Sequence, residues 1–514
     1  MSSRLWTRAV VAQLRASCSQ TLGLGIHKTR IRPSLALWGK SSCLKSYVVL
    51  RQSPLQANAS IYRPSLSTNS QILREQHTAI ATDQRVQSQD PLSHTSKRRS
   101  DQGRVVTEQA VGYWLIGSAV LVFGIVVFGG LTRLTESGLS ITEWKPITGV
   151  MPPRSATEWQ DEFSKYKGSP ECRVLNPGIT LSEFKFIYLM EWTHRVWGRA
   201  IGLVFVLPAS YFVIRRMMST RVALRITGVA TLIGFQGFIG WWMVKSGLKD
   251  ELFKDPGSTP RVSQYRLAVH LGTAFAVYLS MLWTGLEILR ENKWLRGNYL
   301  KTQAIEINSA SILRPFKRSL LGLGLLTFLT AMSGAFVAGL DAGLIYNEFP
   351  YMGNSIVPPR EELMDDFYAR LADKSDRWWR NIFENPTTVQ FDHRVLATAT
   401  FLAATGLYYW SRRFSLTKSS RKAATAMLCF VWLQVALGIS TLVYLVPTPL
   451  AAAHQANSLA VLSSVLLLGS TLTRPRTAFL KFLKTAQSHQ SSVARNQSAA
   501  IRNVHSSCSS GRFL

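Results

Sequence analysis

The most reactive combination of side chains in the sequence is a short run that holds a carboxylate, an imidazole and two guanidiniums. Glu191, His194 and Arg195 lie within five positions, Arg199 follows one helical turn later, and residues 200–214 are uncharged. Residues three apart share one face of a helix, so Glu191 and His194 would lie side by side. Ionisable groups in a membrane span are costly and usually face the interior of a bundle. The run therefore predicts a functional site inside a membrane protein.

Four of the nine histidines lie in apolar segments, and the other five lie in the polar tails. His194, His270, His393 and His454 each lie near the start of such a segment, so all four are expected near one membrane face. Two imidazoles that face each other across a four-helix bundle form the usual axial pair for a haem. We therefore predict two haem sites, the first formed by the first two histidines and the second by the last two.

Three other roles for these histidines explain the pattern less well. Each histidine could be a core residue that bonds to a neighbouring helix, but a set of four that repeats in pairs disfavours this interpretation. Zinc would need four ligands at each site, and no cysteine or acid supplies the missing ones. Copper would lack a thiolate or thioether partner at a suitable spacing.

Three arginines lie close to these histidines in the sequence. Arg195 and Arg394 each follow a histidine directly, and Arg266 lies four residues before His270. Near a membrane face they are candidate partners for the propionates of a haem, because guanidiniums bind carboxylates well. The alternative is that their side chains simply extend to the membrane interface.

One acidic residue distinguishes the two predicted sites. Glu191 lies three positions before His194, whereas Gln390 lies three positions before His393. A protein that only transfers electrons has no evident need for this difference, but an enzyme with one reacting haem and one resident haem would have. Glu191 is therefore the candidate catalytic residue. The alternative is a simple ion pair between Glu191 and Arg195 or Arg199.

Eight apolar segments must position these residues, and each can provide the roughly 20 residues of a membrane span. We expect spans at 109–132, 185–214, 226–244, 267–286, 319–340 and 389–411, and two more within 423–473. The two halves repeat: Phe128–Leu139 resembles Ala335–Leu344, the triplet His-Arg-Val occurs in the second and sixth spans, and His270 aligns with His454. We predict an all-α membrane protein in which eight transmembrane helices form two duplicated four-helix bundles, each with a haem site.

Charge indicates the location and the orientation of the chain. The sequence has 59 Lys and Arg against 29 Asp and Glu, a formal charge of +30, and the tails 1–104 and 474–514 carry most of this excess. The first 74 residues are rich in Arg and Ser and contain no acid, which is typical of a mitochondrial transit peptide, although a disordered basic tail would look similar. Basic loops precede the odd-numbered spans, so both termini are expected in the matrix. The sequence contains no basic face with interleaved aromatic residues, so nucleic acid is not expected as a partner.

Over residues 105–475 the chain resembles the haem A synthases, which are mitochondrial inner-membrane enzymes with bacterial relatives. The most specific similarities are Phe128–Pro153, the run Glu-Trp-Thr-His-Arg-Val-Trp-Gly-Arg at 191–199, and Phe-Asp-His-Arg at 391–394. The resemblance implies oxidation of a ring methyl group of haem O to a formyl group, which gives haem A for cytochrome c oxidase. This chain differs from the family at one point: many bacterial relatives have a cysteine pair in the loop after the first span, where this chain has Cys172 alone.

The resemblance also implies a role for each histidine pair. His194 and His270 would be the axial ligands of haem O as substrate, His393 and His454 would hold a permanent haem b, and Glu191 would be the catalytic carboxylate. The expected partners are a ferredoxin or a similar electron donor, haem O synthase, oxidase assembly factors and membrane lipid, and a homo-oligomer stays open. The alternatives are a non-catalytic dihaem b-type cytochrome and a haem carrier of the inner membrane.

Five regions are expected along the chain on these grounds. They are a transit peptide with a flexible segment at 1–104, an N-terminal bundle for the substrate haem at 105–290, a matrix linker at 291–313, a C-terminal bundle for the resident haem at 314–473, and a basic flexible tail at 474–514.

Overall fold

The structure, a computed structural model, describes residues 106–145, 148–248, 261–296 and 313–509. The expected transit peptide and most of the expected linker lie outside these residues. Within them the secondary structure is helical, apart from one isolated β-bridge between Met352 and Ser355. The expectation of an all-α protein is therefore confirmed for the described part of the chain.

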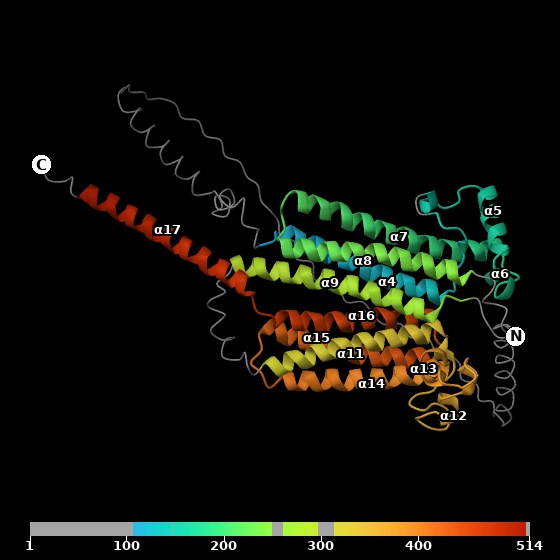
Figure 1. The fold of residues 1–514 in the computed structure, drawn as a ribbon. Coiled ribbons are helices and arrows are strands. Elements are labelled where there is room, and N and C mark those ends of the chain that lie inside the picture. The colour runs from blue at the N-terminus through green and yellow to red at the C-terminus, as the bar shows by residue number, and fades with distance from the viewer. Residues whose placement is uncertain (1–105, 146–147, 249–260, 297–312, 510–514) are drawn as a thin grey trace, which may run out of the picture. The chain divides into compact units, whose positions relative to one another are not determined.

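A long helix lies at each position where a membrane span was expected (Figure 1). These helices are α4 (Gln109–Leu134), α7 (Leu181–Ile214), α8 (Thr220–Gly247), α9 (Gln264–Arg296), α11 (Leu313–Gly339), α14 (Pro386–Ser411), α15 (Lys418–Val443) and α16 (Thr448–Thr471). Seven of them are long and apolar enough to cross a membrane, so the chain is a multi-pass membrane protein. The exception is α14, which carries Gln390, Asp392, His393 and Arg394 and several threonines.

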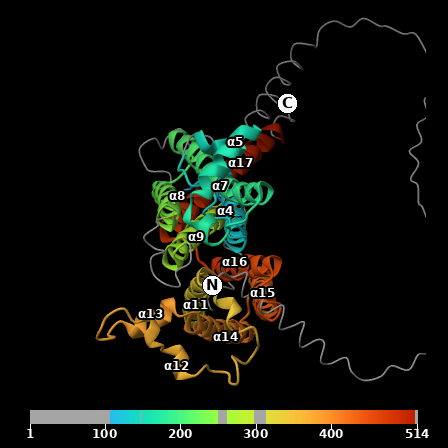
Figure 2. The same cartoon turned by 90° about the vertical axis from the view of Figure 1, so that its right-hand side faces the viewer.

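The long helices pack in two sets of four. In the first set α4 contacts α7 and α9, and α8 contacts α7 and α9; in the second set α11 contacts α14 and α16, and α15 contacts the same two helices. The two sets also touch, because α9 contacts α11 and α16 contacts α4 (Figure 2). Apolar side chains fill each set, for example Phe205, Phe275 and Met281 in the first and Phe316 and Met427 in the second.

The connection between α4 and α7 folds over the beginning of α7. It contains α5 (Ala156–Lys167) and α6 (Pro170–Val174), and its aromatic side chains pack against Phe184 and Tyr188 of α7. Thr180 caps α7, because its side chain accepts a hydrogen bond from the Glu183 backbone while the Glu183 side chain bonds back to Thr180. The first turns of α7, which precede Glu191 and His194, are therefore covered by a folded connection.

The C-terminal segment differs from the expected flexible tail. Thr477–Ser509 forms helix α17, and Phe479 and Leu483 near its beginning are buried against Trp294 and Leu295 of α9. These two apolar side chains were not recognised as an anchor, because the basic composition of the segment dominated its interpretation. The basic segment after residue 474 thus begins with a packed turn.

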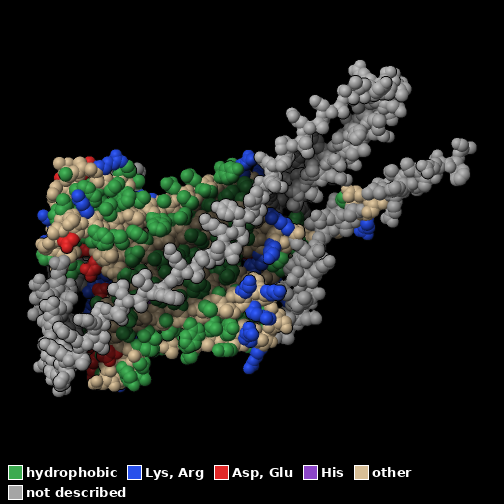
Figure 3. All heavy atoms as spheres, turned by 180° about the vertical axis from the view of Figure 1, so that it is seen from behind, with side chains coloured by type: hydrophobic (Ala, Val, Ile, Leu, Met, Phe, Trp, Pro, Cys, Tyr) green, Lys and Arg blue, Asp and Glu red, His purple; other side chains and the backbone are tan. Residues whose placement is uncertain are grey.

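Positive and negative side chains lie toward opposite ends of the helices. Figure 3 shows Lys and Arg gathered at one end and Asp and Glu toward the other. The connection from α7 to α8 contains Arg215 and Arg216, and the connection from α14 to α15 contains Arg412 and Arg413. The histidines of α7 and α14 lie in the first half of each helix, away from these basic connections, so the candidate site is distant from the basic end.

Candidate functional site

The four histidines share one packing arrangement. Each side chain is partly buried in the first half of its helix, and its Cε1 atom lies against a glycine of the preceding long helix. A Cβ placed on that glycine would lie 2.8 to 3.5 Å from Cε1 in the pairs Gly129–His194, Gly240–His270, Gly334–His393 and Gly438–His454. A Cβ would force a shift at Gly129 and Gly438, would require the ring to move by a few tenths of an ångström at Gly334, and would make an ordinary contact at Gly240. These glycines therefore help to fix the ring positions.

The second pair of histidines has the separation expected of two ligands of one metal ion. The ring centroids of His393 and His454 are 6.4 Å apart, and the ring planes are inclined by 82°. Imidazole nitrogens bind metals at about 2 Å, which places two ligands on opposite sides of one ion with centroids roughly 6 Å apart. The two rings therefore fit an iron atom between them.

The first pair of histidines lies on two helices of one set. His194 is on α7 and His270 is on α9, and both helices contact α4 and α8. The Nδ1 atoms of both histidines are buried and have no hydrogen-bond partner, and the same is true of His454. In the fourth ring, Nδ1 of His393 lies 2.7 Å from the Ser333 hydroxyl. Buried polar atoms normally have partners, and of the four Nδ1 atoms only that of His393 has one among the described residues.

Polar neighbours lie beside two of the histidines. Gln236 of α8 donates its amide N–H to the His270 carbonyl oxygen at 2.8 Å. The Gln434 amide nitrogen of α15 lies 3.4 Å from Nε2 of His454, and its carbonyl oxygen accepts a bond from Asn457. The described residues contain no group of three or more His, Cys, Asp or Glu that could hold a metal ion. A metal at these pairs would therefore need ligands from outside the protein, as a porphyrin provides.

Glu191 is buried, and its hydrogen bonds join it both to the segment after α4 and to Arg195 of its own helix. Its side chain is 3% exposed. One carboxylate oxygen accepts bonds from the Ser140 hydroxyl and the Ile141 backbone N–H, both at 2.8 Å. The other accepts two bonds from Arg195, at 3.0 and 2.6 Å. The ion pair with Arg195 that the sequence left open as an alternative is present, whereas Arg199 bonds to the carbonyl oxygens of Lys145 and Gly149.

The equivalent position in the second half lacks this ion pair. Gln390 donates its amide N–H to the Tyr346 carbonyl oxygen at 2.9 Å, and its own carbonyl oxygen is buried without a partner. Arg394 donates to the carbonyl oxygens of Tyr346, Glu348 and Tyr351, and its Nε has no partner. In both halves the arginine thus anchors the segment after the preceding helix, but only the first half has a carboxylate there.

The three arginines considered for haem propionates differ in their contacts. The guanidiniums of Arg195 and Arg394 are bonded to backbone carbonyl groups, a contact that the sequence did not indicate. Arg266 lies one turn before His270, donates to the Ser246 hydroxyl and lies 4.6 Å from the Trp242 ring centroid. Arg195 is paired with Glu191, and Arg394 is bonded to three backbone carbonyl oxygens, whereas the contact of Arg266 with a polar group is with the Ser246 hydroxyl, so Arg266 is the best placed of the three to bind an anionic group.

A second buried carboxylate near Glu191 was not identified from the sequence. Glu171 of α6 is 3% exposed, and one of its oxygens has no hydrogen-bond partner. Burial raises the pKa of Glu171 to about 8, and the negative charges of Glu191 and Glu136 add to the effect. Cys172, the next residue, is a buried free thiol that contacts the Asn176 carbonyl oxygen at 3.5 Å. No sequence signal distinguishes Glu171 from an exposed loop acid.

Known proteins resemble most of this chain. A family model for cytochrome oxidase assembly proteins, COX15-CtaA, matches residues 112–466. Heme A synthase COX15 of Saccharomyces cerevisiae is 52% identical over 377 residues, which are 73% of this chain and 78% of that protein. Heme A synthase COX15 of Homo sapiens is 47% identical over 367 residues, 71% of this chain and 83% of that protein. A Schizosaccharomyces pombe protein named Heme A synthase-mitochondrial ferredoxin fusion protein is 48% identical over 374 residues, 71% of this chain and 60% of the fusion.

Proposed function

The chain belongs to the COX15-CtaA family and has haem A synthase function, and we propose that it converts haem O to haem A by oxidising a ring methyl group to a formyl group. The observation that carries this proposal is the difference between Glu191 and Gln390 in otherwise similar surroundings. Haem O binds as the substrate in the first helix set, with His194 and His270 as iron ligands. A resident haem b binds in the second set through His393 and His454.

The resident haem supplies one-electron transfer when it is bound. His393 and His454 hold it between α14 and α16, and their ring separation of 6.4 Å supports this assignment. The pairing of Ser333 with Nδ1 of His393 leaves the other ring nitrogen for the iron. Gly334 and Gly438 keep both rings in position.

Glu191 acts on the substrate through its negative charge. It lies one helical turn before His194, and four hydrogen bonds hold its two oxygens in place. A fixed carboxylate can stabilise positive charge that develops at the methyl carbon, and it needs no rearrangement to do so. Removal of a proton from the methyl carbon would require Glu191 to leave Arg195 first. The contacts therefore favour charge stabilisation over proton removal.

The way in which oxygen reaches the methyl group is limited by the two histidines. If His194 and His270 both held the iron of the substrate haem, dioxygen could reach that iron only after one of them moved away. Otherwise the methyl group would take its oxygen atom from water and give up its electrons to an acceptor. Gly129 packs closely against His194, whereas Gly240 lies in ordinary contact with His270, so the packing restrains the first ring more than the second.

A ferredoxin is the electron donor that we propose. The support is the Schizosaccharomyces pombe relative, in which a haem A synthase and a mitochondrial ferredoxin form one polypeptide. A fused donor acts at a high effective concentration, so natural fusions often join partners that act together. Haem O synthase, oxidase assembly factors and a second copy of this chain are further proposed partners, on the resemblance alone.

We propose that the chain lies in the mitochondrial inner membrane with eight spans and both termini in the matrix. Eight spans include α14, whose polar side chains lie in its first turns, where they can face the haem site rather than lipid. The basic connections after α7 and α14 support a matrix location for that end. The bundles at 105–290 and 314–473 are then the substrate and resident halves, related by duplication.

The direct test is haem analysis in cells that make haem O but no haem A. Wild-type protein should yield haem A, and Glu191→Gln should accumulate haem O or a partly oxidised haem. Arg413→Gln, an exposed change at the other end of the helices, is the matched control and should behave as wild type. Wild-type protein that binds haem but yields no haem A would indicate a dihaem cytochrome, and full activity of Glu191→Gln would remove the proposed role of the carboxylate.

A further inference from the structure

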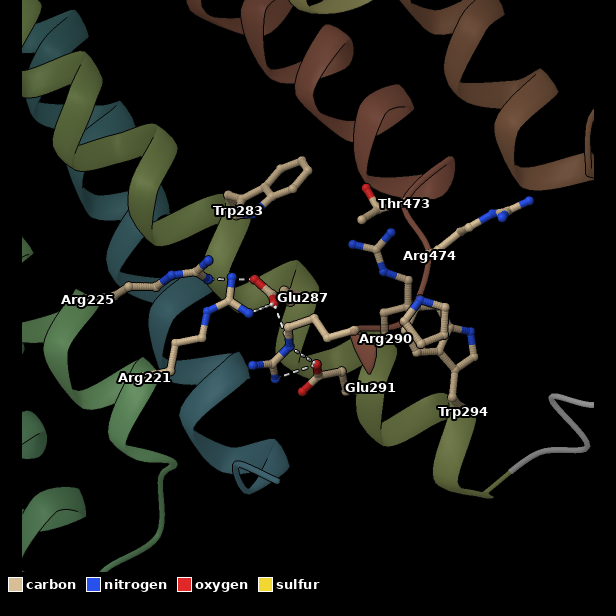
Figure 4. A pocket seen from close by; sticks show the side chains of 11 residues that line it. Arg221, Arg225, Trp283, Glu287, Arg290, Glu291, Trp294, Thr473 and Arg474 are labelled. Carbon is tan, nitrogen blue, oxygen red and sulfur yellow. Dashed lines mark hydrogen bonds and ion pairs between the residues drawn. The ribbon is translucent and has the colours of Figure 1, made fainter. Parts of the chain in front are cut away.

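A small pocket lies at the basic end of the helices, at the opposite end from the histidines (Figure 4). It has a volume of about 120 Å³, well above the roughly 10–15 Å³ that one water molecule needs. Its walls come from the beginning of α8, the end of α9 and residues 473–476, which connect α16 to α17. The pocket therefore lies where the first helix set meets the connection between α16 and α17.

Guanidiniums dominate the lining of this pocket. Five arginines and two glutamates line it, so the lining side chains carry a net charge of +3. The arginines are Arg221, Arg225, Arg290, Arg474 and Arg476. Arginines at such density near a pocket are the usual way in which proteins bind phosphate, because the planar guanidinium donates two parallel hydrogen bonds.

The two acids of the pocket are already shared among several arginines. Glu287 pairs with Arg225 at 2.5 Å, with Arg476 at 3.4 Å and with Arg221 at 3.7 Å. Glu291 is buried and accepts bonds from Arg476 at 2.6 and 2.9 Å. In Figure 4 Arg221 and Arg225 extend from α8 toward Glu287. These contacts hold the arginines around the pocket without neutralising the group.

Arg290 is the residue that indicates a ligand. Its Nη1 is buried and has no hydrogen-bond partner, and its guanidinium lies 5.6 Å from the centroid of the Trp294 ring. A buried donor on a charged group without an acceptor is costly, and an anion in the pocket would remove this cost. Trp283 and Trp294 also line the pocket, and tryptophan is enriched at the level of lipid headgroups.

We propose that this arginine pocket binds a phosphate anion, presented by the headgroup of an anionic phospholipid. Basic pockets between transmembrane helices recognise such headgroups. The location at the ends of α8 and α9 and the two tryptophans favour a lipid over a phosphate from solution. The bound headgroup contacts α8 and α9 of the first helix set and residues 473–476, so it ties the C-terminal connection to that set.

The test uses the full-length protein, purified in detergent and stripped of lipid. Native mass spectrometry then measures the binding of phosphatidylglycerol and of phosphatidylcholine. Wild type should bind one phosphatidylglycerol at least tenfold more tightly than phosphatidylcholine, and Arg290→Gln should lower that affinity about tenfold. Arg413→Gln, which removes an exposed arginine at the same end but outside the pocket, should bind as wild type.

A second variant and a titration with inorganic phosphate complete the test. Arg474→Gln changes an exposed lining residue, so it should fold normally and bind phosphatidylglycerol several-fold more weakly, even if Arg290→Gln does not fold. Inorganic phosphate without lipid distinguishes the sources: a rise in melting temperature for wild type but not for Arg290→Gln, with no preference for phosphatidylglycerol, would assign the site to free phosphate. Equal binding of both lipids together with no effect of phosphate would overturn the proposal.

Discussion

At the scale of single residues, the site depends on which atoms can approach the four imidazoles. Each ring lies against a helical glycine, and two of the rings have a spacing that fits an iron between them. Glycine in a helix interior is destabilising by roughly 0.5–1 kcal/mol relative to alanine. Four glycines at equivalent positions are therefore best explained by the rings that they accommodate, and this explanation can be tested one pair at a time.

Gly438→Ala should displace His454, because the added Cβ would lie 2.9 Å from the Cε1 atom of the ring. Overpacking of this kind costs about 1–3 kcal/mol. We expect a several-fold lower ratio of resident haem to protein in the visible spectrum. Gly406→Ala in α14 is the control, because no atom lies within 4 Å of the added Cβ, and it should keep its haem. Normal haem content in Gly438→Ala would show that the close approach is not needed.

Glu171 should make the stability of the protein fall as pH rises. Its folded pKa is about 8, against an ordinary value of 4.5, so the folded state holds a proton that the unfolded chain has lost over this range. The stabilising contribution is complete below about pH 4.5 and is lost as pH rises through 8. Glu171→Gln should flatten this decline and raise the melting temperature near pH 8 by several degrees. The exposed Glu361→Gln is the control, and an unchanged pH profile in Glu171→Gln would contradict the assignment.

At the scale of elements, the repeated feature is a helix that begins with its functional residues and is anchored to the segment after the preceding helix. Arg195 holds the segment that contains Ile141 and Glu143, and Arg394 holds the one that contains Tyr346 and Glu348. The polar start of α14 also explains why this helix is less apolar than the other seven long ones. If α14 spans the membrane, its two ends must lie on opposite sides of the membrane.

Single cysteines at exposed Ser375 and Ser419, before and after α14, should be labelled from opposite sides of the membrane. The background is a variant whose own cysteines are replaced by serine. In mitoplasts an impermeant maleimide should reach Ser375→Cys directly and Ser419→Cys only after permeabilisation. Labelling of both from the same side would show that α14 does not cross, and the proposed total of eight spans would be wrong.

At the scale of the whole molecule, hydropathy was sufficient to locate the eight helices of the two sets, because a span must be apolar over a fixed length. Contacts between distant segments could not be predicted in the same way. The sequence offered the pairing of Glu191 with Arg195 only as an alternative, and it gave no sign that Glu171 is buried beside the site. The arginine pocket was also missed, because α8, α9 and residues 473–476 meet only in the folded chain.

The positions of the histidines predicted more of the structure than the distribution of charge did. Their placement in alternate segments predicted two pairs, and the 6.4 Å separation of His393 and His454 agrees with one such pair. The basic composition of the last segment instead suggested a flexible tail, although Phe479 anchors a helix there. The long apolar segments and the repeated histidines thus predicted the structure better than net charge did.

The central claim is that the two helix sets hold different haems, and replacement of the histidines one at a time tests it most directly. The measurement is the type and amount of haem extracted from purified His194→Ala, His270→Ala, His393→Ala and His454→Ala proteins, made in cells that supply haem O. We expect the first two variants to keep haem b and to lose haem O and haem A, and the last two to lose haem b. Loss of haem b from His194→Ala or His270→Ala, with haem b retained in the other two, would contradict the division into a substrate half and a resident half.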